Sequence, residues 1–406
     1  MATQPPRSQL RDLRERRGFS QKSLARALRV SWTTVQRWEL GESLPRATHR
    51  YGLARILDVP LDALDQFFTS PSPERRTSAG AVHACIPALR RVLAARDFPE
   101  DGPVGSFEHL RQRVARLVGQ RLQSDYFALA ADAPAVLAEL HRAIANSPRE
   151  HRGTCARLLV NAYRAADAIA DKYGYYDLSA RIIDLMSDAA VDAEDELLVA
   201  SCAYVRGETF FATLDYATGR RALEAAGAQI RTTDSATAAA TYGALHMRAA
   251  VLAARGGDAV RARDHIAEAQ QFACKVNEGV HQGTVFGPAS ARIHQLSLDA
   301  ELGDVGGAMR TAGRWRPPTS LPAERRSHFY IELGRVRHLA GRNDNAISAL
   351  LTASQIAPEH VREHPHVNSI VRTLWETNAG SPSKGLLELR DKVLPLQALV
   401  ESGGTR

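Results

Sequence analysis

The stretch RRGFSQKSLARALRVSWTTVQRWELGESLP, residues 16–45, decides the fold of the N-terminal part of the chain. Ser20 and Ser31 each precede apolar residues at helical spacing, and serine is a preferred residue at a helix N-cap. The stretch therefore predicts two short helices joined by a tight turn, with Gly41 ending the second helix. The buried faces of these helices are expected to hold Leu24, Ala25, Leu28, Val35 and Trp38.

Further short helices are predicted on both sides of this pair. Leu10 and Leu13 indicate a helix that ends at Gly18, and the apolar pattern of residues 46–57 indicates a fourth helix. Pro60 can begin a fifth helix over residues 61–67, because proline is favoured in the first turn of a helix. Residues 1–68 are therefore predicted to form a five-helix domain.

The segment TSPSPERRTSAG, residues 69–80, predicts an exposed linker, because it has two Ser-Pro steps and no apolar periodicity. Residues 81–150 are expected to be helical without a repeat register. Residues 384–400 indicate a capping helix that is interrupted at Pro395.

Between these two segments, helical patterns recur with breaks spaced roughly 40 residues apart, which is typical of helical repeats. The breaks fall at Gly174, Leu214, Gly257, Gly303 and Gly341. The most regular unit, HFYIELGRVRHLAGRNDNAISALLTASQIAP at residues 328–358, resembles the tetratricopeptide repeat, in which small residues let two antiparallel helices approach closely. One such unit cannot bury its apolar face alone, so we expect an all-α protein with an α-solenoid over residues 81–400.

Composition supports an all-α protein and indicates a polyanionic partner. Aromatic residues make up only 6% of the 406 residues, while Ala, Leu and Arg dominate. The formal charge is +7, and residues 1–68 contribute 12 basic and 7 acidic side chains to it. A small basic domain attached to a larger, nearly neutral one is typical of proteins that bind nucleic acid.

The sequence gives no sign of export. The first residues lack the apolar stretch of a signal peptide, and no uninterrupted apolar run is long enough to span a membrane. The four cysteines are far apart and form no CxxC pair, so we expect free thiols in a reducing compartment. These observations predict a cytoplasmic protein with no membrane partner.

The stretch at residues 16–45 resembles the Cro/CI-type (XRE) family of bacterial regulators, because its caps, its apolar spacing and its closing Trp-Glu-x-Gly occur together. The resemblance continues through LARILDVPLDAL, residues 53–64. It implies a helix-turn-helix whose second helix, at residues 31–40, enters the major groove of DNA. The alternative is a helical bundle with a solvated basic face, since most charge runs are only solvated.

By that resemblance, the recognition helix presents Trp32, Thr33, Gln36 and Arg37, and Arg37 can pair with guanine through two hydrogen bonds. Arg29 stands where the family has glycine in the turn, and there it adds a cation that can reach phosphate. The full set of DNA-binding residues expected from the resemblance is Ser20, Gln21, Arg29, Ser31, Trp32, Thr33, Gln36 and Arg37. Arg14 and Glu39 occupy positions that pair with each other inside the domain.

In tetratricopeptide units, the groove is lined by the second, fifth and ninth residues of each first helix. We place the helix starts near Val160, Ala200, Gly243, Ala289 and Ser327. The ligand-binding residues predicted in this way are Asn161, Arg164, Tyr204, Glu208, Met247 and Arg335, and the same pattern includes Ser297 and His328. Amide, guanidinium and aromatic groups suit an extended peptide. The alternative is that these residues only solvate a scaffold.

The whole architecture resembles regulators that join an XRE-type reader to a repeat domain, including the peptide-sensing RRNPP group and long XRE regulators of high-GC bacteria. It implies a transcription regulator whose repeat domain senses a peptide or small molecule. One reader makes few contacts with DNA, so we expect a homodimer that forms through the C-terminal domain and reads a palindromic operator. Two alternatives are a DNA-bound scaffold that recruits a protein partner without a small ligand, and a regulator of a toxin or prophage module.

Signals of catalysis are weak. The segment EHVREHPH, residues 359–366, places His360 and His364 at i and i+4, but it lacks HExxH order and Pro365 is expected to end the helix. The motifs GxGxxG, GxxxxGK[ST] and GxSxG do not occur. We therefore expect no enzyme activity, no cofactor and no metal site.

Overall fold

The computed structural model describes residues 8–40, 43, 45, 47–59, 64, 79–232, 235–378 and 381–394. Within these residues the chain forms twenty helices and one two-stranded hairpin, so the predicted all-α class is confirmed. The hairpin, β1 (Gly279–His281) and β2 (Thr284–Phe286), pairs antiparallel and was not predicted.

Four short helices form the N-terminal domain around a core of its own. They are α1 (Ser8–Arg16), α2 (Gln21–Leu28), α3 (Trp32–Leu40) and α4 (Ala47–Ile56). Leucines from α1, α2 and α4 meet Val35 and Trp38 of α3 in this core, and Leu64 is also buried in it. The rest of the fifth helix predicted over residues 61–67 lies outside the described residues, as does the predicted linker up to residue 78. The domain limits given above stay predictions.

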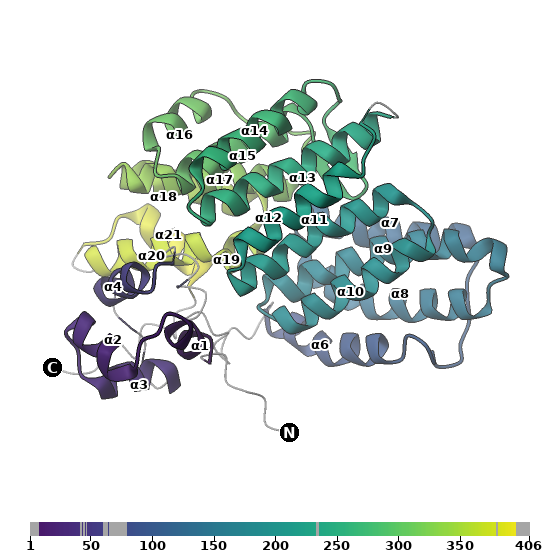
Figure 1. Ribbon diagram of the computed structural model, residues 1–406, viewed down its shortest axis with the longest axis horizontal. Coiled ribbons are helices and arrows are strands. Elements are labelled where there is room, and N and C mark those ends of the chain that lie inside the picture. Colours follow the sequence, from purple (N-terminus) through teal and green to yellow (C-terminus); the bar gives the residue numbers. More distant parts are fainter. Residues whose placement is uncertain are drawn as a thin grey trace.

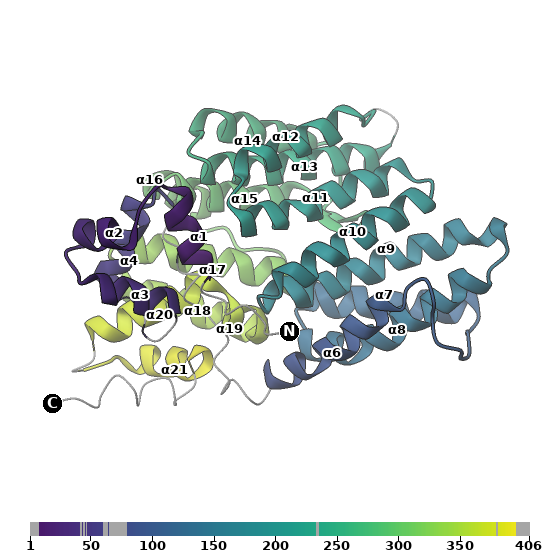
Figure 2. The same cartoon turned by 60° about the horizontal axis from the view of Figure 1, so that its bottom comes forward.

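Five helix pairs build the larger part of the molecule, as Figures 1 and 2 show. The region opens with α6 (Ala79–Ala94), α7 (Phe107–Gln123) and α8 (Tyr126–Asn146). The pairs are α9 (Arg149–Lys172) with α10 (Tyr176–Asp192), α11 (Glu196–Thr213) with α12 (Tyr216–Ala228), α13 (Ala236–Arg255) with α14 (Ala259–Ala273), α15 (Pro288–Glu301) with α16 (Val305–Ala312), and α17 (Ala323–Leu339) with α18 (Asn343–Ile356). The region closes with α19 (Pro358–Glu363), α20 (Pro365–Thr377) and α21 (Lys384–Val393).

The turns inside the five pairs are those that the sequence predicts. Each first helix is followed by a left-handed residue, and four of the five are glycines, which adopt this conformation at little cost. These residues are Gly174, Leu214, Gly257, Gly303 and Gly341. The first helices begin earlier than predicted, and α9 begins at Arg149 rather than near Val160, because the residues before the apolar pattern are helical as well.

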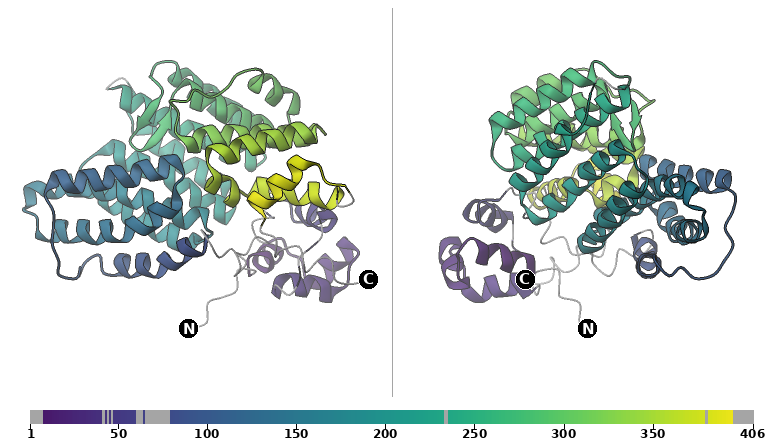
Figure 3. Two further views of the ribbon diagram at one scale, coloured as in Figure 1. Left: turned by 180° about the vertical axis from the view of Figure 1, so that it is seen from behind. Right: turned by 45° about the vertical axis from the view of Figure 1, so that its right-hand side comes forward.

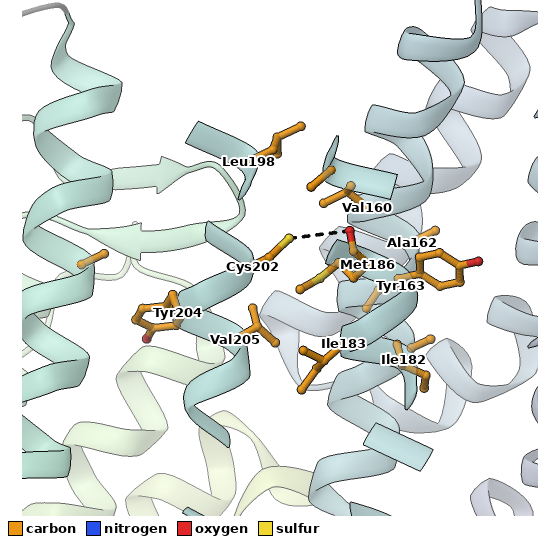
Figure 4. Close-up of a cluster of buried hydrophobic side chains, with 14 of the residues drawn as sticks. Val160, Ala162, Tyr163, Ile182, Ile183, Met186, Leu198, Cys202, Tyr204 and Val205 are labelled. Atoms are coloured by element: carbon orange, nitrogen blue, oxygen red, sulfur yellow. Dashed lines mark hydrogen bonds between the residues drawn. The ribbon is translucent and has the colours of Figure 1, made fainter. Parts of the chain in front are cut away.

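Figure 4 shows how neighbouring pairs pack in the core that α9, α10 and α11 share. Tyr163 of α9, Ile183 and Met186 of α10, and Val205 of α11 are all buried there. The thiol of Cys202 donates a hydrogen bond to the carbonyl of Met186, at 3.7 Å. All four cysteines of the chain are unpaired.

The superhelix closes on itself, so helices far apart in the sequence touch. α7 packs against α17, and the backbone N–H of Phe127 at the start of α8 donates to Oε2 of Glu359 on α19, at 3.0 Å. The N-terminal domain lies at the same end of the molecule as α20 and α21 (Figures 1 and 3). Leu214, in the turn between α11 and α12, packs against the core of that domain.

The last described helix, α21, begins at Lys384, where the capping helix is predicted to begin. Leu386, Leu389 and Val393 of α21 are buried against α18 and α20, which agrees with a capping role. Residues 395–400 of the predicted helix lie outside the described residues. Among the helices that are described, none has the length and apolar character needed to cross a membrane.

Candidate nucleic-acid interface and interior polar cluster

Serine side chains cap the N-termini of α2 and α3, and one left-handed residue lies in the turn between the two helices. Oγ of Ser20 accepts a hydrogen bond from the N–H of Ser23 at 3.0 Å, and Oγ of Ser31 accepts one from the N–H of Thr34 at 3.1 Å. Arg29 adopts φ 56° and ψ 40°, as expected for a residue that replaces glycine in this turn. Arg29 and the cap at Ser31 therefore form the turn between the two helices.

α3 buries one face and exposes the other. Val35 and Trp38 are 0% and 2% exposed, and Glu39 is buried beside them. Trp32, at 47% exposure, and Thr33 and Arg37 are exposed, while Gln36 is half-buried. The orientation predicted for the helix is confirmed, and the DNA contacts of its outer residues stay predictions.

An ion pair inside the domain fixes α3 against α1. Arg14 and Glu39 are buried and joined at 2.5 Å from Nε to Oε1, which confirms the predicted pairing. The side-chain amide of Gln21 donates to the other oxygen of Glu39 at 2.6 Å. The sequence predicts that Gln21 contacts phosphate. To do so, its side-chain amide would have to give up or share the hydrogen bond to Glu39.

Sequence reasoning missed two cations beside the recognition helix. Lys22 and Arg26 are exposed on one face of α2 at i and i+4, and Arg29 is exposed directly after the helix, in the turn that leads to α3. That spacing is visible in the sequence. Together the three residues give the N-terminal domain a basic edge next to α3.

A second group of polar residues lies in the interior of the superhelix, around Tyr204 of α11. Figure 4 shows Tyr204 pointing away from the core that holds Cys202 and Met186. The guanidinium of Arg248, on α13, lies 4.1 Å from the centre of its ring, and that of Arg164, on α9, lies 5.7 Å away. Arg248 also pairs with Glu208 at 3.4 Å. Cations above an aromatic face are attracted by the ring quadrupole.

The charges around this ring shift its acidity. Burial raises the pKa of the Tyr204 hydroxyl, but Arg248, Arg325 and Arg164 together outweigh burial and lower the pKa to about 8. Burial, with a further contribution from Arg121, lowers the pKa of Arg164 to about 9. The arginines around the ring therefore favour the anionic form of the Tyr204 hydroxyl.

The hairpin of β1 and β2 already binds part of this cluster. Arg164 donates to the carbonyl of Gln282 at 2.8 Å and to Oγ1 of Thr284 at 2.7 Å, and Arg121 of α7 donates to the carbonyl of Gly283 at 2.8 Å. The ring of Phe286 packs where Gly243 of α13 has no side chain. Backbone oxygens of the hairpin thus accept hydrogen bonds from both arginines.

The structure brings together three of the six predicted groove residues, namely Arg164, Tyr204 and Glu208. The other three lie apart from any shared surface. Met247 is 0% exposed in the core, Arg335 pairs with Glu301 at 2.9 Å, and Asn161 bonds to the carbonyl of Arg157 on its own helix. Their roles in ligand binding stay predictions. Arg121, Arg248 and the hairpin were missed, because long-range contacts place them here.

Histidines form a third cluster, which contains two residues of the EHVREHPH segment. His328, His360 and His364 each offer one ring nitrogen, and these three atoms lie within 4.8 Å of one another. The spacing can hold a metal ion.

Comparison with known proteins agrees with the N-terminal geometry. Residues 10–64 match the family model of the helix-turn-helix. The N-terminal domain is therefore a DNA-binding helix-turn-helix domain of the XRE type. No curated protein sequence matches the chain. The structure of Bacillus thuringiensis PlcR in complex with the peptide PapR7 and DNA is similar at 15% sequence identity and a TM-score of 0.30, over 66% of this chain and 94% of that chain.

Proposed function

We propose that the chain is a sequence-specific transcription regulator that binds a palindromic operator as a homodimer and responds to a peptide or small molecule. The observation that carries the proposal is the orientation of α3. Val35 and Trp38 anchor the helix in the core, while Trp32, Thr33 and Arg37 are exposed and not covered by the larger region. An exposed helix face of this size fits the major groove.

Each outer residue of α3 has a chemical role in this proposal. The guanidinium of Arg37 reads guanine through O6 and N7, a contact that provides about 1–3 kcal/mol of discrimination. Thr33 contacts a thymine methyl group or a base edge, and the ring of Trp32 packs on sugar or a thymine methyl group. Lys22, Arg26 and Arg29 neutralise phosphates and position α3 without reading sequence.

Selection of binding sites from random DNA, followed by affinity measurements at several salt concentrations, tests this proposal. Arg37→Ala is expected to relax base preference at one position of each half-site. Arg29→Ala is expected to weaken binding evenly across sequences and to reduce the slope of log affinity against log salt by about 1. Arg263→Ala, an exposed arginine on α14, is the matched control. Unchanged base preference in Arg37→Ala would show that α3 does not read bases.

We expect dimerisation because one helix-turn-helix domain has only a small contact area on DNA. A single domain buries only about 600–1,000 Å² on DNA, and two half-sites one helical turn apart are the usual way to increase affinity. We place the contact between copies in the C-terminal domain. Sedimentation of the full chain with and without a palindromic DNA checks this, and a monomer at micromolar concentration in both would contradict it.

The interior cluster around Tyr204 is the place where we expect a signal to bind. Arg121, Arg164 and Arg248 come from three different helices, and arginine binds carboxylates through a two-pronged fork. A ligand with a carboxylate would compete with the carbonyl oxygens of Gln282 and Gly283 for the guanidinium groups of Arg164 and Arg121. Ligand binding would therefore change the position of the hairpin. The hairpin contacts α13 and α15, through which a shift can reach neighbouring pairs.

Thermal unfolding of the full chain with a peptide pool or cell extract tests the sensor. A ligand that binds only the folded state raises the unfolding temperature. Arg164→Ala should remove that rise, and Arg263→Ala should keep it. The recruiting scaffold is the competing proposal, and it is favoured if no extract shifts unfolding while a stable protein partner copurifies. In both cases the protein works without catalysis, beside the chromosome in the cytoplasm.

A further inference from the structure

The histidine cluster joins three separate segments of the C-terminal region. His328 lies on α17, His360 on α19, and His364 between α19 and α20. The ring centres of His360 and His364 are 5.5 Å apart, and those of His328 lie 6.4 Å and 6.1 Å from them. The three imidazoles therefore surround a common point rather than stacking in a row.

Two prolines explain why the segment folds this way. Pro358 begins α19 and Pro365 begins α20, so the chain turns at His364, which has extended backbone angles. Proline is favoured in the first turn and ends a preceding helix. The sequence spacing alone gave no reason to expect a site, because the third ligand comes from α17, more than thirty residues earlier in the chain.

Neighbouring hydroxyls hold two of the rings. Oγ of Ser327 is 2.7 Å from Nδ1 of His360, so Nε2 of that ring is available to a ligand. Oγ of Ser297, on α15, is 3.3 Å from Nε2 of His328, which leaves Nδ1 of that ring. Hydrogen bonds of this kind to the second nitrogen are typical of histidines that bind metals, because they fix the ring orientation and the tautomer.

The third ring has a nitrogen that nothing in the described residues satisfies. Nδ1 of His364 is buried and has no hydrogen-bond partner there. Buried polar atoms are almost always paired, so an unpaired one calls for a ligand or an ion. Glu324 of α17 interacts electrostatically with His328 and His360, and its negative charge offsets Arg325 and Lys172 nearby.

We propose that His328, His360 and His364 bind one divalent transition-metal ion, of which Zn²⁺ is the best match. Imidazole nitrogen is a favoured ligand of zinc, and three histidines leave a fourth position open for water or another ligand. The ion connects α17 to α19 and α20. Arg325 of α17 interacts with Tyr204 as well as with Glu324 beside the histidines, so the site adjoins the cluster around Tyr204.

Titration of the full chain with zinc sulfate, after removal of metal with a chelator, tests the site. We expect one Zn²⁺ per chain and a rise in unfolding temperature, because the ion binds only the folded arrangement. Mg²⁺ and Ca²⁺ should have no effect, since both prefer oxygen ligands. Co²⁺ in place of Zn²⁺ should give the strong visible absorption of a tetrahedral site. Wild-type protein that binds no Zn²⁺ at micromolar concentration would overturn the proposal.

Variants locate the ion. His360→Ala and His364→Ala should each lower zinc affinity by at least about tenfold, and Ser327→Ala should lower it by roughly 10- to 100-fold through loss of ring orientation. His338→Ala, near the other end of α17, should bind like wild type. Circular dichroism without metal shows whether each alanine variant folds. If one does not, His328→Gln takes its place, because His328 is only half-buried and the change is conservative. Wild-type affinity in a folded His364→Ala or His328→Gln variant would disprove the assignment.

Discussion

Arg14 and Glu39 form an ion pair inside the N-terminal domain, with Nε of Arg14 only 2.5 Å from Oε1 of Glu39 and both side chains buried. Arg14 lies on α1 and Glu39 on α3, so the pair holds the recognition helix in place. Arg14 also donates to the carbonyl of Phe19 at 2.7 Å, and Gln21 donates to Glu39. The network thus connects α1, the start of α2 and α3.

Removal of one partner should therefore unfold this domain more easily. Glu39→Ala leaves the guanidinium of Arg14 buried without its carboxylate, and a change of this kind costs about 3–5 kcal/mol. Urea unfolding followed by tryptophan fluorescence measures it, because Trp38 is buried in the same core. The double variant Arg14→Met, Glu39→Leu should lose less stability than Glu39→Ala. A double variant that loses more would show that the pair itself stabilises the domain.

Arg29 should show opposite effects on stability and on DNA affinity. Its left-handed backbone, with φ 56°, costs a residue with a side chain about 1–2 kcal/mol, and glycine avoids that cost. Glycine also makes the unfolded chain more flexible, which lowers stability by about 0.4–1 kcal/mol, so Arg29→Gly should leave stability unchanged or raise it by up to about 1.6 kcal/mol. DNA affinity should fall because a cation is lost. Arg29→Ala, which keeps the backbone strain, is the comparison, and equal stability of the two variants would contradict the explanation.

The contact between Gly243 and Phe286 should couple α13 to the hairpin. A Cβ at position 243 would overlap the ring of Phe286, so Gly243→Ala should destabilise the fold by about 1–3 kcal/mol through overpacking. Phe286→Ala should cost about 3–5 kcal/mol by leaving a cavity. In the double variant the added methyl group has room, so its loss of stability should be smaller than the sum of the two single losses. Additive losses would mean that the two positions do not interact.

Local signals in the sequence were sufficient for much of the fold. Ser20 and Ser31 cap the two central helices of the reader as predicted, and Arg29 adopts the left-handed backbone expected at its position. The five turns of the repeat pairs were found because glycine, or in one case Leu214, follows each first helix. These features depend on a few adjacent residues, so one sequence contains the information.

The hairpin, the position of Met247 and the histidine cluster could not be predicted in the same way, because they depend on contacts between residues far apart in the sequence. The hairpin at Gly279–Phe286 has no strong alternating pattern, and it is held by Arg121 and Arg164, which lie more than a hundred residues earlier. Met247 was placed in the groove by counting from a helix start at Gly243, but α13 begins at Ala236, and the side chain lies in the core. His328 likewise reaches His360 and His364 only through the packing of α17 on α19 and α20.

Tyr204 should titrate in the folded chain well before an ordinary tyrosine. The surrounding arginines lower its pKa to about 8, while a tyrosine in the unfolded chain has a pKa of about 10. Between these pH values the folded chain has lost the proton that the unfolded chain still binds, so the stabilisation from Tyr204 grows as pH rises from 8 to 10. The same stabilisation is lost as pH falls below 8.

Near-ultraviolet absorbance of tyrosinate should therefore rise near pH 8 in the wild type and not in Tyr204→Phe. The difference in unfolding free energy between the two proteins should widen by at most about 1.4 kcal/mol per pH unit inside the window. Tyr126, whose pKa burial raises to about 12, provides the control, since Tyr126→Phe should leave the early rise unchanged. A folded wild-type chain with no tyrosinate below pH 9 would show that Arg248, Arg325 and Arg164 do not overcome the burial of the Tyr204 ring, and it would contradict the proposal that arginines at this place attract the carboxylate of a ligand.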